Sequence, residues 1–175
     1  MRVFMSRRSL IPSMMGVSLA ALVISSSANA KITQIQITSR TTMFDGASFG
    51  AVGAYEQIDG IALGEIDPKD PLNALIQDIA LAPKNVRGMV EYSTDISILK
   101  PINPLNGNRT LLYETVNRGR KNLPFFNIGG DLQKPGDGFL QREGYSIAWS
   151  GWEGDVTTGV KMKLPVARNP DGSSI

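Results

Sequence analysis

The sequence predicts an α/β fold that is rich in β-strands, with antiparallel strands first and parallel strands later. Two observations support this prediction. In residues 31–99, short segments that alternate apolar and polar side chains follow one another across brief turns, as antiparallel strands do. After residue 110, two strand-like segments are separated by residues 117–144, and a connection of this length is typical of a parallel pair.

The first segments predict short strands joined by turns. Residues 31–38 alternate isoleucines with polar side chains and predict the first strand. A glycine-rich turn region follows in residues 42–53. Within residues 54–66, Asp59-Gly60 then separates two apolar segments. Because Asp-Gly is a preferred pair in two-residue hairpin turns, the sequence predicts a pair of strands that turns there.

The next part of the chain predicts a short helix and a longer strand. Asp70 before Pro71 fits the N-cap and the first position of a helix that ends a few residues later, at about position 76. Residues 86–99 predict either one long strand or a bent pair that changes direction at Thr94-Asp95.

The last segments predict a strand, the end of a helix and a second strand. Residues 110–116 are rich in β-branched, apolar and aromatic side chains, which predicts an interior strand. Residues 139–143 predict the last turns of a helix, and Gly144 fits the glycine that ends it. Residues 145–150 predict a second strand, which lies parallel to the strand predicted at residues 110–116.

The first thirty residues predict a secretory signal peptide. A positive segment, an apolar segment and a small-residue cleavage site follow one another: Arg2, Arg7 and Arg8, then residues 14–24, then Ala28-Asn29-Ala30. Residues 6–11 resemble a twin-arginine signal, and an ordinary secretion signal fits as well. A membrane anchor needs about 20 apolar residues, and the apolar segment at residues 14–24 is shorter than that. We therefore expect an exported protein, periplasmic or secreted, whose mature chain begins at Lys31 and has no membrane span.

The composition excludes several classes of function. Three of the eighteen Lys and Arg residues lie in the signal peptide, which leaves fifteen against sixteen acidic residues, a formal charge of −1. This balance gives no basis for binding nucleic acid. The chain contains no cysteine and no histidine, so it has neither a disulfide nor a complete Ser-His-Asp triad. A zinc site is not expected, and we expect no metal and no cofactor.

The turn after residues 110–116 is unusual for the exit of a strand. It holds Asn117, Arg118 and Gly119, followed by Arg120 and Lys121. One interpretation is a polar turn whose three cations face water. The other is that the turn presents backbone amides to a negatively charged group, with the glycine allowing close approach. The residues alone leave both interpretations open.

Three blocks of the sequence resemble the N-terminal part of a family of exported proteins described as α/β-hydrolase domain proteins. The blocks are residues 49–101, residues 111–122 and residues 136–155, in the order that the family has. The Asn-Arg-Gly-Arg turn and the Trp-Ser-Gly-Trp segment are their most specific features. The resemblance covers nearly the whole mature chain. It implies the first part of an α/β-hydrolase-like sheet in a secreted serine hydrolase that cleaves a small-molecule ester or amide.

The resemblance also implies a role for the turn. In α/β hydrolases, one amide of the oxyanion hole comes from the loop after the third strand of the sheet. If residues 111–116 are that strand, Asn117, Arg118 and Gly119 are candidates for the oxyanion hole. Arg118 could additionally hold a carboxylate of the substrate.

The chain departs from this family in its catalytic residues. The nucleophile motif Gly-x-Ser-x-Gly is missing, and there is no histidine to act as the base. We therefore expect residues 31–175 to be an incomplete N-terminal part of a longer hydrolase, with no catalytic residue of its own and inactive alone. The interior place of residues 110–116 would then apply to the longer protein.

The alternative is a non-catalytic, β-rich periplasmic module that binds a ligand. Trp149 and Trp152 lie at the end of a predicted strand and could line its pocket, although packing in the core explains such aromatic residues as well. Asp131 and Asp137 lie among glycines but lack the oxygen spacing of an EF-hand, so we expect loop carboxylates there rather than a calcium site.

Overall fold

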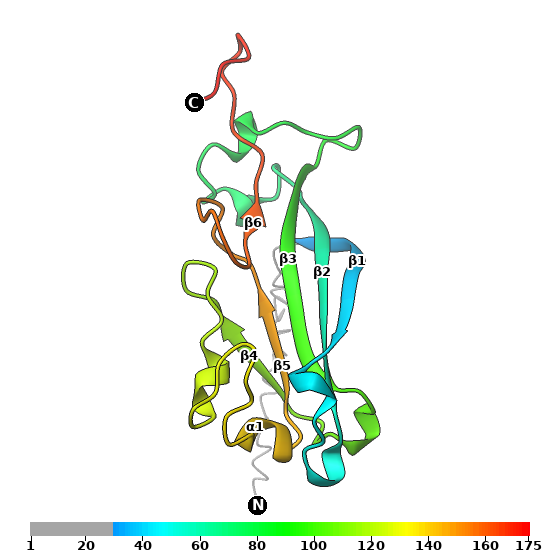
Figure 1. The fold of residues 1–175 in the computed structure, drawn as a ribbon. Coiled ribbons are helices and arrows are strands. Elements are labelled where there is room, and N and C mark those ends of the chain that lie inside the picture. Colours follow the sequence, from blue (N-terminus) through cyan, green and yellow to red (C-terminus); the bar gives the residue numbers. More distant parts are fainter. Residues whose placement is uncertain (1–29) are drawn as a thin grey trace, which may run out of the picture.

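The computed structural model describes residues 30–175, and the predicted signal peptide lies outside them except for Ala30. These residues form a β-rich mixed sheet with few helices (Figure 1). The strands are β1 (Lys31–Thr42), β2 (Tyr55–Ile66), β3 (Val90–Pro101), β4 (Leu111–Thr115), β5 (Ser146–Ser150) and β6 (Met162–Lys163). The α-helix is α1 (Phe139–Arg142), and the short 3₁₀ turns are η1 (Phe44–Gly46), η2 (Gly50–Val52), η3 (Pro71–Asn73), η4 (Ile79–Leu81), η5 (Pro104–Asn106) and η6 (Leu123–Phe126).

The sheet combines an antiparallel start with a later parallel pair, as expected. Its strand order is β1-β2-β3-β5-β4, and β6 pairs with the N-terminal part of β3. β1, β2 and β3 are antiparallel to one another, and β3 is antiparallel to β5. β4 and β5 are parallel, with Leu111 opposite Ser146. A β-rich mixed sheet with few helices is therefore confirmed.

The hairpin predicted at Asp59-Gly60 is wrong, because both residues lie in the middle of the continuous strand β2. Asp59 is opposite Ser97 of β3, and the two side chains are hydrogen-bonded. Gly60 faces β1, where a Cβ atom would lie 2.5 Å from the carbonyl oxygen of Gln36. β1 also has a register shift next to this position. The glycine therefore allows a close approach of two strands at a bulge and not a turn.

The long-strand alternative for residues 86–99 is confirmed, and the bend at Thr94-Asp95 is not present. β3 pairs along its whole length with β2. On its other side β3 pairs with β6 at residues 93–94 and with β5 at residues 96–99, and Asp95 lies between these two partners. The carbonyl oxygen of Asp95 accepts a hydrogen bond from the amide of Gly151 (2.9 Å), so the ladder is not interrupted.

The two predicted helical segments are short. Asp70 caps η3, since its side chain accepts a hydrogen bond from the amide of Leu72, but the helix is one 3₁₀ turn and stops before residue 76. α1 ends at Arg142, and Gly144 follows its C-cap residue as predicted, with a φ of +76° and its amide donated to the carbonyl of Gln141. This is the left-handed glycine expected after the last helical residue.

β4 lies at an edge of the sheet in the described residues. Leu111 and Tyr113 are exposed, whereas Val116, just beyond the strand, is buried in the core. The interior position predicted for residues 110–116 is therefore not found in residues 30–175, because no strand of this part of the chain pairs with the open side of β4. An interior position would require a strand from outside these residues.

The main hydrophobic cluster joins the sheet to the turns before β2 and to α1. Tyr55 is at its centre: its ring contacts Phe49 edge to face, and its hydroxyl donates to the carbonyls of Gln141 and Tyr145. Burial raises the pKa of Tyr55 well above its ordinary value. The buried apolar residues of this cluster are Met43, Phe49, Val52, Tyr55, Leu99, Val116, Leu140, Ile147, Trp149 and Val160.

No helix in residues 30–175 has both the length and the apolar character needed to span a membrane.

Candidate functional site

The chain leaves β4 through a tight two-residue turn at Asn117–Arg120. The amide and carbonyl of Asn117 pair with the carbonyl and amide of Arg120, at 3.3 and 3.0 Å. Arg118 and Gly119 occupy the two central positions, with φ angles of +52° and +77°. Positive φ at both positions is the requirement of a type I′ turn. The three predicted residues of the oxyanion hole thus form one compact turn.

The turn leaves two backbone donors unused. In the part of the chain that the structure describes, no hydrogen bond has the amide of Arg118 or Gly119 as its donor. The carbonyl of Gly119 does have a partner, since it accepts a hydrogen bond from the amide of Val160 (3.0 Å). Successive amides held in a turn conformation form sites for negatively charged groups. The turn can therefore offer two adjacent donors to an oxyanion.

Gly119 is required by the packing of the turn. A Cβ atom on Gly119 would lie 2.4 Å from the carbonyl oxygen of Thr158, and one on Gly159 would lie 2.2 Å from the carbonyl oxygen of Gly119. The two loops therefore meet glycine against glycine. The sequence suggested that Gly119 allows a substrate to approach, and the structure adds a second reason for a glycine here. This contact also holds the turn in place.

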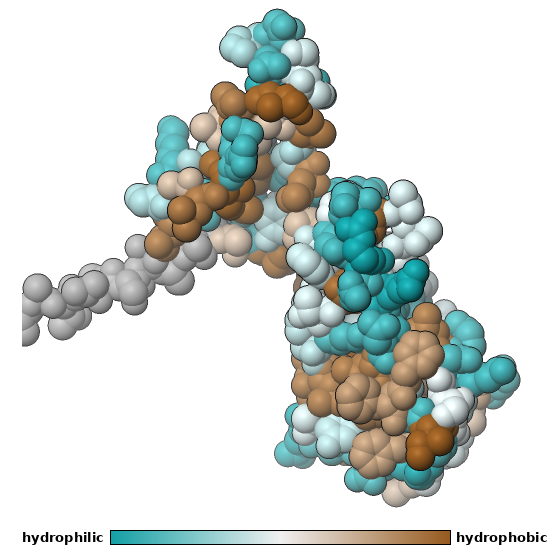
Figure 2. All heavy atoms as spheres, turned by 90° about the vertical axis from the view of Figure 1, so that its left-hand side faces the viewer, coloured by the Kyte–Doolittle hydropathy of each residue, from teal (hydrophilic) through white to brown (hydrophobic). Residues whose placement is uncertain are grey.

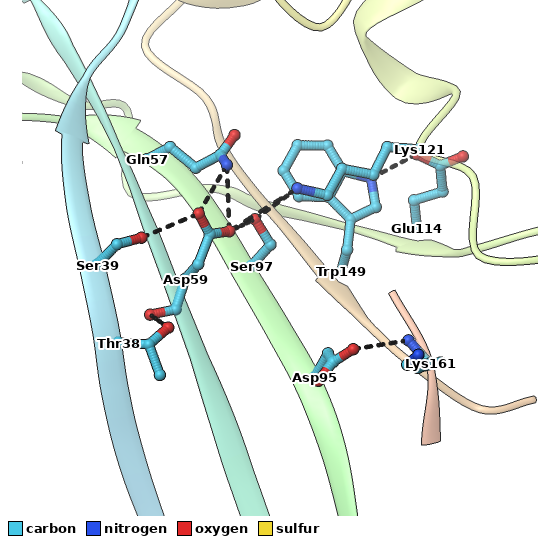
Figure 3. Close-up of polar contacts among 10 residues, drawn as sticks. All are labelled: Thr38, Ser39, Gln57, Asp59, Asp95, Ser97, Glu114, Lys121, Trp149 and Lys161. Carbon is cyan, nitrogen blue, oxygen red and sulfur yellow. Dashed lines mark hydrogen bonds and ion pairs between the residues drawn. The ribbon is translucent and has the colours of Figure 1, made fainter. Parts of the chain in front are cut away.

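A carboxylate of β4 fastens the segment that follows the turn. Glu114 accepts hydrogen bonds from the amides of Asn122 and Leu123, at 2.7–3.0 Å. The same carboxylate accepts a hydrogen bond from the indole nitrogen of Trp149 on the neighbouring strand β5, at 2.6 Å (Figure 3). Glu114 thus connects the strand before the turn, the segment after it and the core of the sheet.

Lys121 is the second fastening of this segment. Its ammonium donates to Ser97 Oγ on β3 at 2.7 Å, and Ser97 Oγ donates in turn to Asp59 Oδ1 on β2 at 2.6 Å (Figure 3). The Lys121 and Asp59 charges are 3.9 Å apart, and the ammonium lies 4.8 Å from the centre of the Trp149 ring. The Lys121 side chain is only 13% exposed. Of the three cations expected to face water, this one does not.

The charges of this cluster change the ionisation of both groups. Burial lowers the pKa of Lys121, and the charge of Asp59 opposes the shift. For Asp59, burial acts to raise the pKa, but hydrogen bonds from Ser97 and Gln57 and the charge of Lys121 outweigh it and leave the pKa below its ordinary value. The arrangement therefore favours an ion pair bridged by Ser97.

Arg118 is directed to acidic residues of its own chain. Its guanidinium contacts the carboxylates of Asp155 at 2.9 Å and of Glu153 at 3.4 Å. The hydrogen bond to Asp155 raises the pKa of Arg118, and the same bond lowers the pKa of Asp155. A substrate carboxylate would have to compete with both acids for this side chain.

A cavity of about 560 Å³ adjoins the turn. It is bounded by the turn, by the segment that contains η6 and by the loop before β6. Its lining residues are Gly119, Arg120, Lys121, Asn122, Phe125, Leu132, Gly159 and Val160. The volume is within the range of sites for small molecules.

The two tryptophans occupy different environments, and neither lines this cavity. Trp149 is 2% exposed and belongs to the main hydrophobic cluster. Trp152 is 53% exposed, and its indole nitrogen donates to the carbonyl of Val116 at 2.6 Å. Trp149 therefore contacts both residues that hold the segment after the turn, Glu114 and Lys121. Trp152 covers the end of β4.

Several residues of the site were not expected from the sequence. Glu114 and Ser97 lie within strands and carried no motif, and Asp59 was interpreted only as part of a hairpin turn. One signal could have identified Glu114: alternation along β4 places it on the same face as Leu112, which is half-buried, and an acidic residue on a buried face requires donors. No group of three or more His, Cys, Asp or Glu side chains within residues 30–175 could hold a metal ion.

Comparison of the chain with protein-family models, with curated proteins and with solved structures found no match.

Proposed function

We propose that this chain is the leading part of an exported serine hydrolase that cleaves esters or amides, and that the Asn117–Arg120 turn supplies backbone donors to the oxyanion. The observation that carries the proposal is the pair of unused amides at Arg118 and Gly119, held in a tight turn beside an apolar cavity. The turn follows the first strand of the parallel pair, where an α/β hydrolase has one of its oxyanion donors.

The turn meets the physical requirement for such a role, which is rigidity before the reaction begins. Donors that already point at the developing negative charge need no reorganisation in the transition state. Three contacts hold the segment: Gly119 against Gly159, Glu114 to the amides of Asn122 and Leu123, and Lys121 to Ser97. Each contact reaches a different part of the structure. Small movements of the turn are therefore opposed from several sides.

The nucleophile and its base come from outside this chain in the proposed enzyme. No histidine is present in the 175 residues. Within residues 30–175, Ser97 is the serine that is hydrogen-bonded to a basic side chain, but it is buried and its hydroxyl is bonded to both Asp59 and Lys121. Burial lowers the pKa of Lys121 and the charge of Asp59 opposes that shift, but the Ser97 hydroxyl donates its hydrogen to Asp59 and accepts one from Lys121, so Lys121 is not placed to take the serine proton. The open side of β4 is where further strands would join the sheet.

A non-catalytic ligand-binding protein is the second candidate. The observation in its favour is that residues of this chain alone form the cavity beside Gly119. The tryptophans proposed for such a pocket do not contribute to it. Under this second function the turn would bind a negatively charged group of the ligand without any chemical step.

The DNA that follows codon 175 separates the two functions. The hydrolase requires a reading frame that continues into a Gly-x-Ser-x-Gly motif and a later histidine. The longer product should hydrolyse a p-nitrophenyl ester, and replacing the motif serine by alanine should abolish turnover. The 175-residue chain should show no turnover. A stop at codon 176 in every related gene, or ester turnover by the short chain, would contradict the proposal.

Export is tested on the protein recovered outside the cytoplasm. Cleavage after Ala30 gives a mature chain that begins at Lys31. Intact-mass measurement should show the loss of residues 1–30. An exported protein that keeps Met1 would contradict the signal-peptide prediction.

A further inference from the structure

The cavity beside Gly119 is lined by apolar side chains and also by Arg120, Lys121 and the backbone at Gly119. Phe125, Leu132 and Val160 supply the apolar part, and Phe125 is 60% exposed. Figure 2 shows apolar side chains gathered on the face of the molecule that carries β4 and the loops after it. The exposed apolar residues of these segments include Leu111, Tyr113, Phe125, Phe126, Ile128 and Leu132.

Arg120 is the charged group that this cavity leaves available. It lines the cavity, and it forms no ion pair within residues 30–175. The cations on either side differ from it: Arg118 is held by Asp155 and Glu153, and the ammonium of Lys121 is bonded to Ser97. Within the described residues no acidic side chain lines the cavity. The net charge of the lining is therefore positive.

We propose that this cavity binds a carboxylic acid with an apolar body. The apolar body would lie against Phe125, Leu132 and Val160, and the carboxylate would lie beside Arg120 and the unused amide of Gly119. Such an acid is the acyl product of the hydrolysis proposed above, and only this last identification rests on the proposed function.

The positive lining distinguishes this ligand from other occupants. A neutral apolar molecule would gain nothing from the exposed Arg120, and a cationic ligand would be repelled. A second copy of the chain would have to cover the cavity with an acidic and apolar surface. A carboxylate attached to an apolar chain is the simplest ligand that fits both the apolar lining and the unpaired cation.

Octanoate is a suitable probe, with 1-octanol as its neutral counterpart. Titration of the ¹⁵N-labelled chain should shift the amide signals of Gly119, Arg120 and Gly159, and octanoate should bind more tightly than octanol. Arg120→Gln should weaken octanoate binding by roughly threefold to tenfold and leave octanol binding unchanged. Arg109→Gln is the matched control, because Arg109 is an exposed arginine that does not line the cavity.

Several outcomes would overturn the inference. Octanol binding as tightly as octanoate would remove the role of the cation, and equal losses in the Arg120 and Arg109 variants would indicate only a general charge effect. Absence of shifts at Gly119 and Gly159, with sedimentation showing a dimer, would assign the face to a second copy. Binding as expected, together with a longer protein that has no esterase activity, would leave this inference standing and reject the proposed function.

Discussion

The ammonium of Lys121 donates a hydrogen bond to Ser97 Oγ at 2.7 Å, across 24 residues of sequence. This contact ties the segment after the turn to the middle of β3, and through Ser97 to Asp59 on β2. The position of the turn therefore depends on three strands and not only on the strand it leaves.

Lys121→Met should destabilise the protein by about 1–3 kcal/mol, because the buried Ser97 and the partly exposed Asp59 lose a charged partner. The methionine keeps most of the side-chain volume above the Trp149 ring. Urea unfolding followed by circular dichroism measures the change. Lys163→Met, at an exposed lysine of β6, is the control and should change the free energy of unfolding little. Equal effects of the two substitutions would contradict the structural role of Lys121.

Glu114→Gln should loosen the segment after the turn. A neutral amide oxygen accepts more weakly than a carboxylate, and the variant cannot satisfy two backbone amides and the Trp149 indole equally well; the expected loss is about 1–3 kcal/mol. Hydrogen exchange should accelerate at the amides of Asn122 and Leu123. Glu143→Gln is the control, since Glu143 is exposed. Unchanged exchange at both amides would show that Glu114 does not hold the segment.

Gly119→Ala should destabilise the protein more than Gly88→Ala. The two glycines have nearly the same φ, +77° and +78°, so the cost of an alanine in the left-handed region is shared. Only Gly119 has a backbone oxygen, that of Thr158, within 2.4 Å of the new Cβ atom, whereas nothing lies within 4 Å at Gly88. The difference should be a further loss of about 1–3 kcal/mol. Equal losses in thermal unfolding would mean that the two loops do not pack as described.

Asp59 should contribute to the stability of the protein at neutral pH and lose this contribution in acid. Its pKa is lower in the folded state than its ordinary value of about 4. The stabilisation is therefore complete above about pH 4 and disappears as the pH falls through the folded-state pKa. In Asp59→Asn, the free energy of unfolding should fall less steeply with decreasing pH below 4. The same slope as in Asp45→Asn, a change at an exposed aspartate, would contradict this assignment.

The sequence was a good guide to the strands and the turn and a poor one to the contacts that fix them. Residues 110–116 and 145–150 follow local composition, so the parallel pair could be predicted. Local rules lead to the wrong prediction of a hairpin at Asp59-Gly60, because Asp-Gly between apolar segments usually marks a turn. What overrides the rule is long-range: Ser97 binds Asp59, and the backbone of β1 approaches Gly60.

The burial of Lys121 illustrates the same limit. It stands in a run of polar residues that suggests a solvent-facing turn. Its environment is set by Ser97 and Trp149, which precede and follow it by more than twenty residues. The availability of Arg120, in contrast to Arg118, likewise depends on acidic residues near position 155. The residue types identify the turn as a candidate site. Only the fold shows which of its cations has no acidic or hydroxyl partner within residues 30–175.

Donation from the turn to an oxyanion can be tested by removing one backbone donor in the proposed longer hydrolase. Replacing Gly119 by glycolic acid changes the amide N–H to an ester oxygen and adds no side chain. Gly129, also at positive φ and with an amide that donates to no acceptor within residues 30–175, is the matched control. The value of kcat should fall by a factor of about 10²–10³ for the change at Gly119 and stay the same for the change at Gly129. Full activity with an ester at position 119 would contradict the claim.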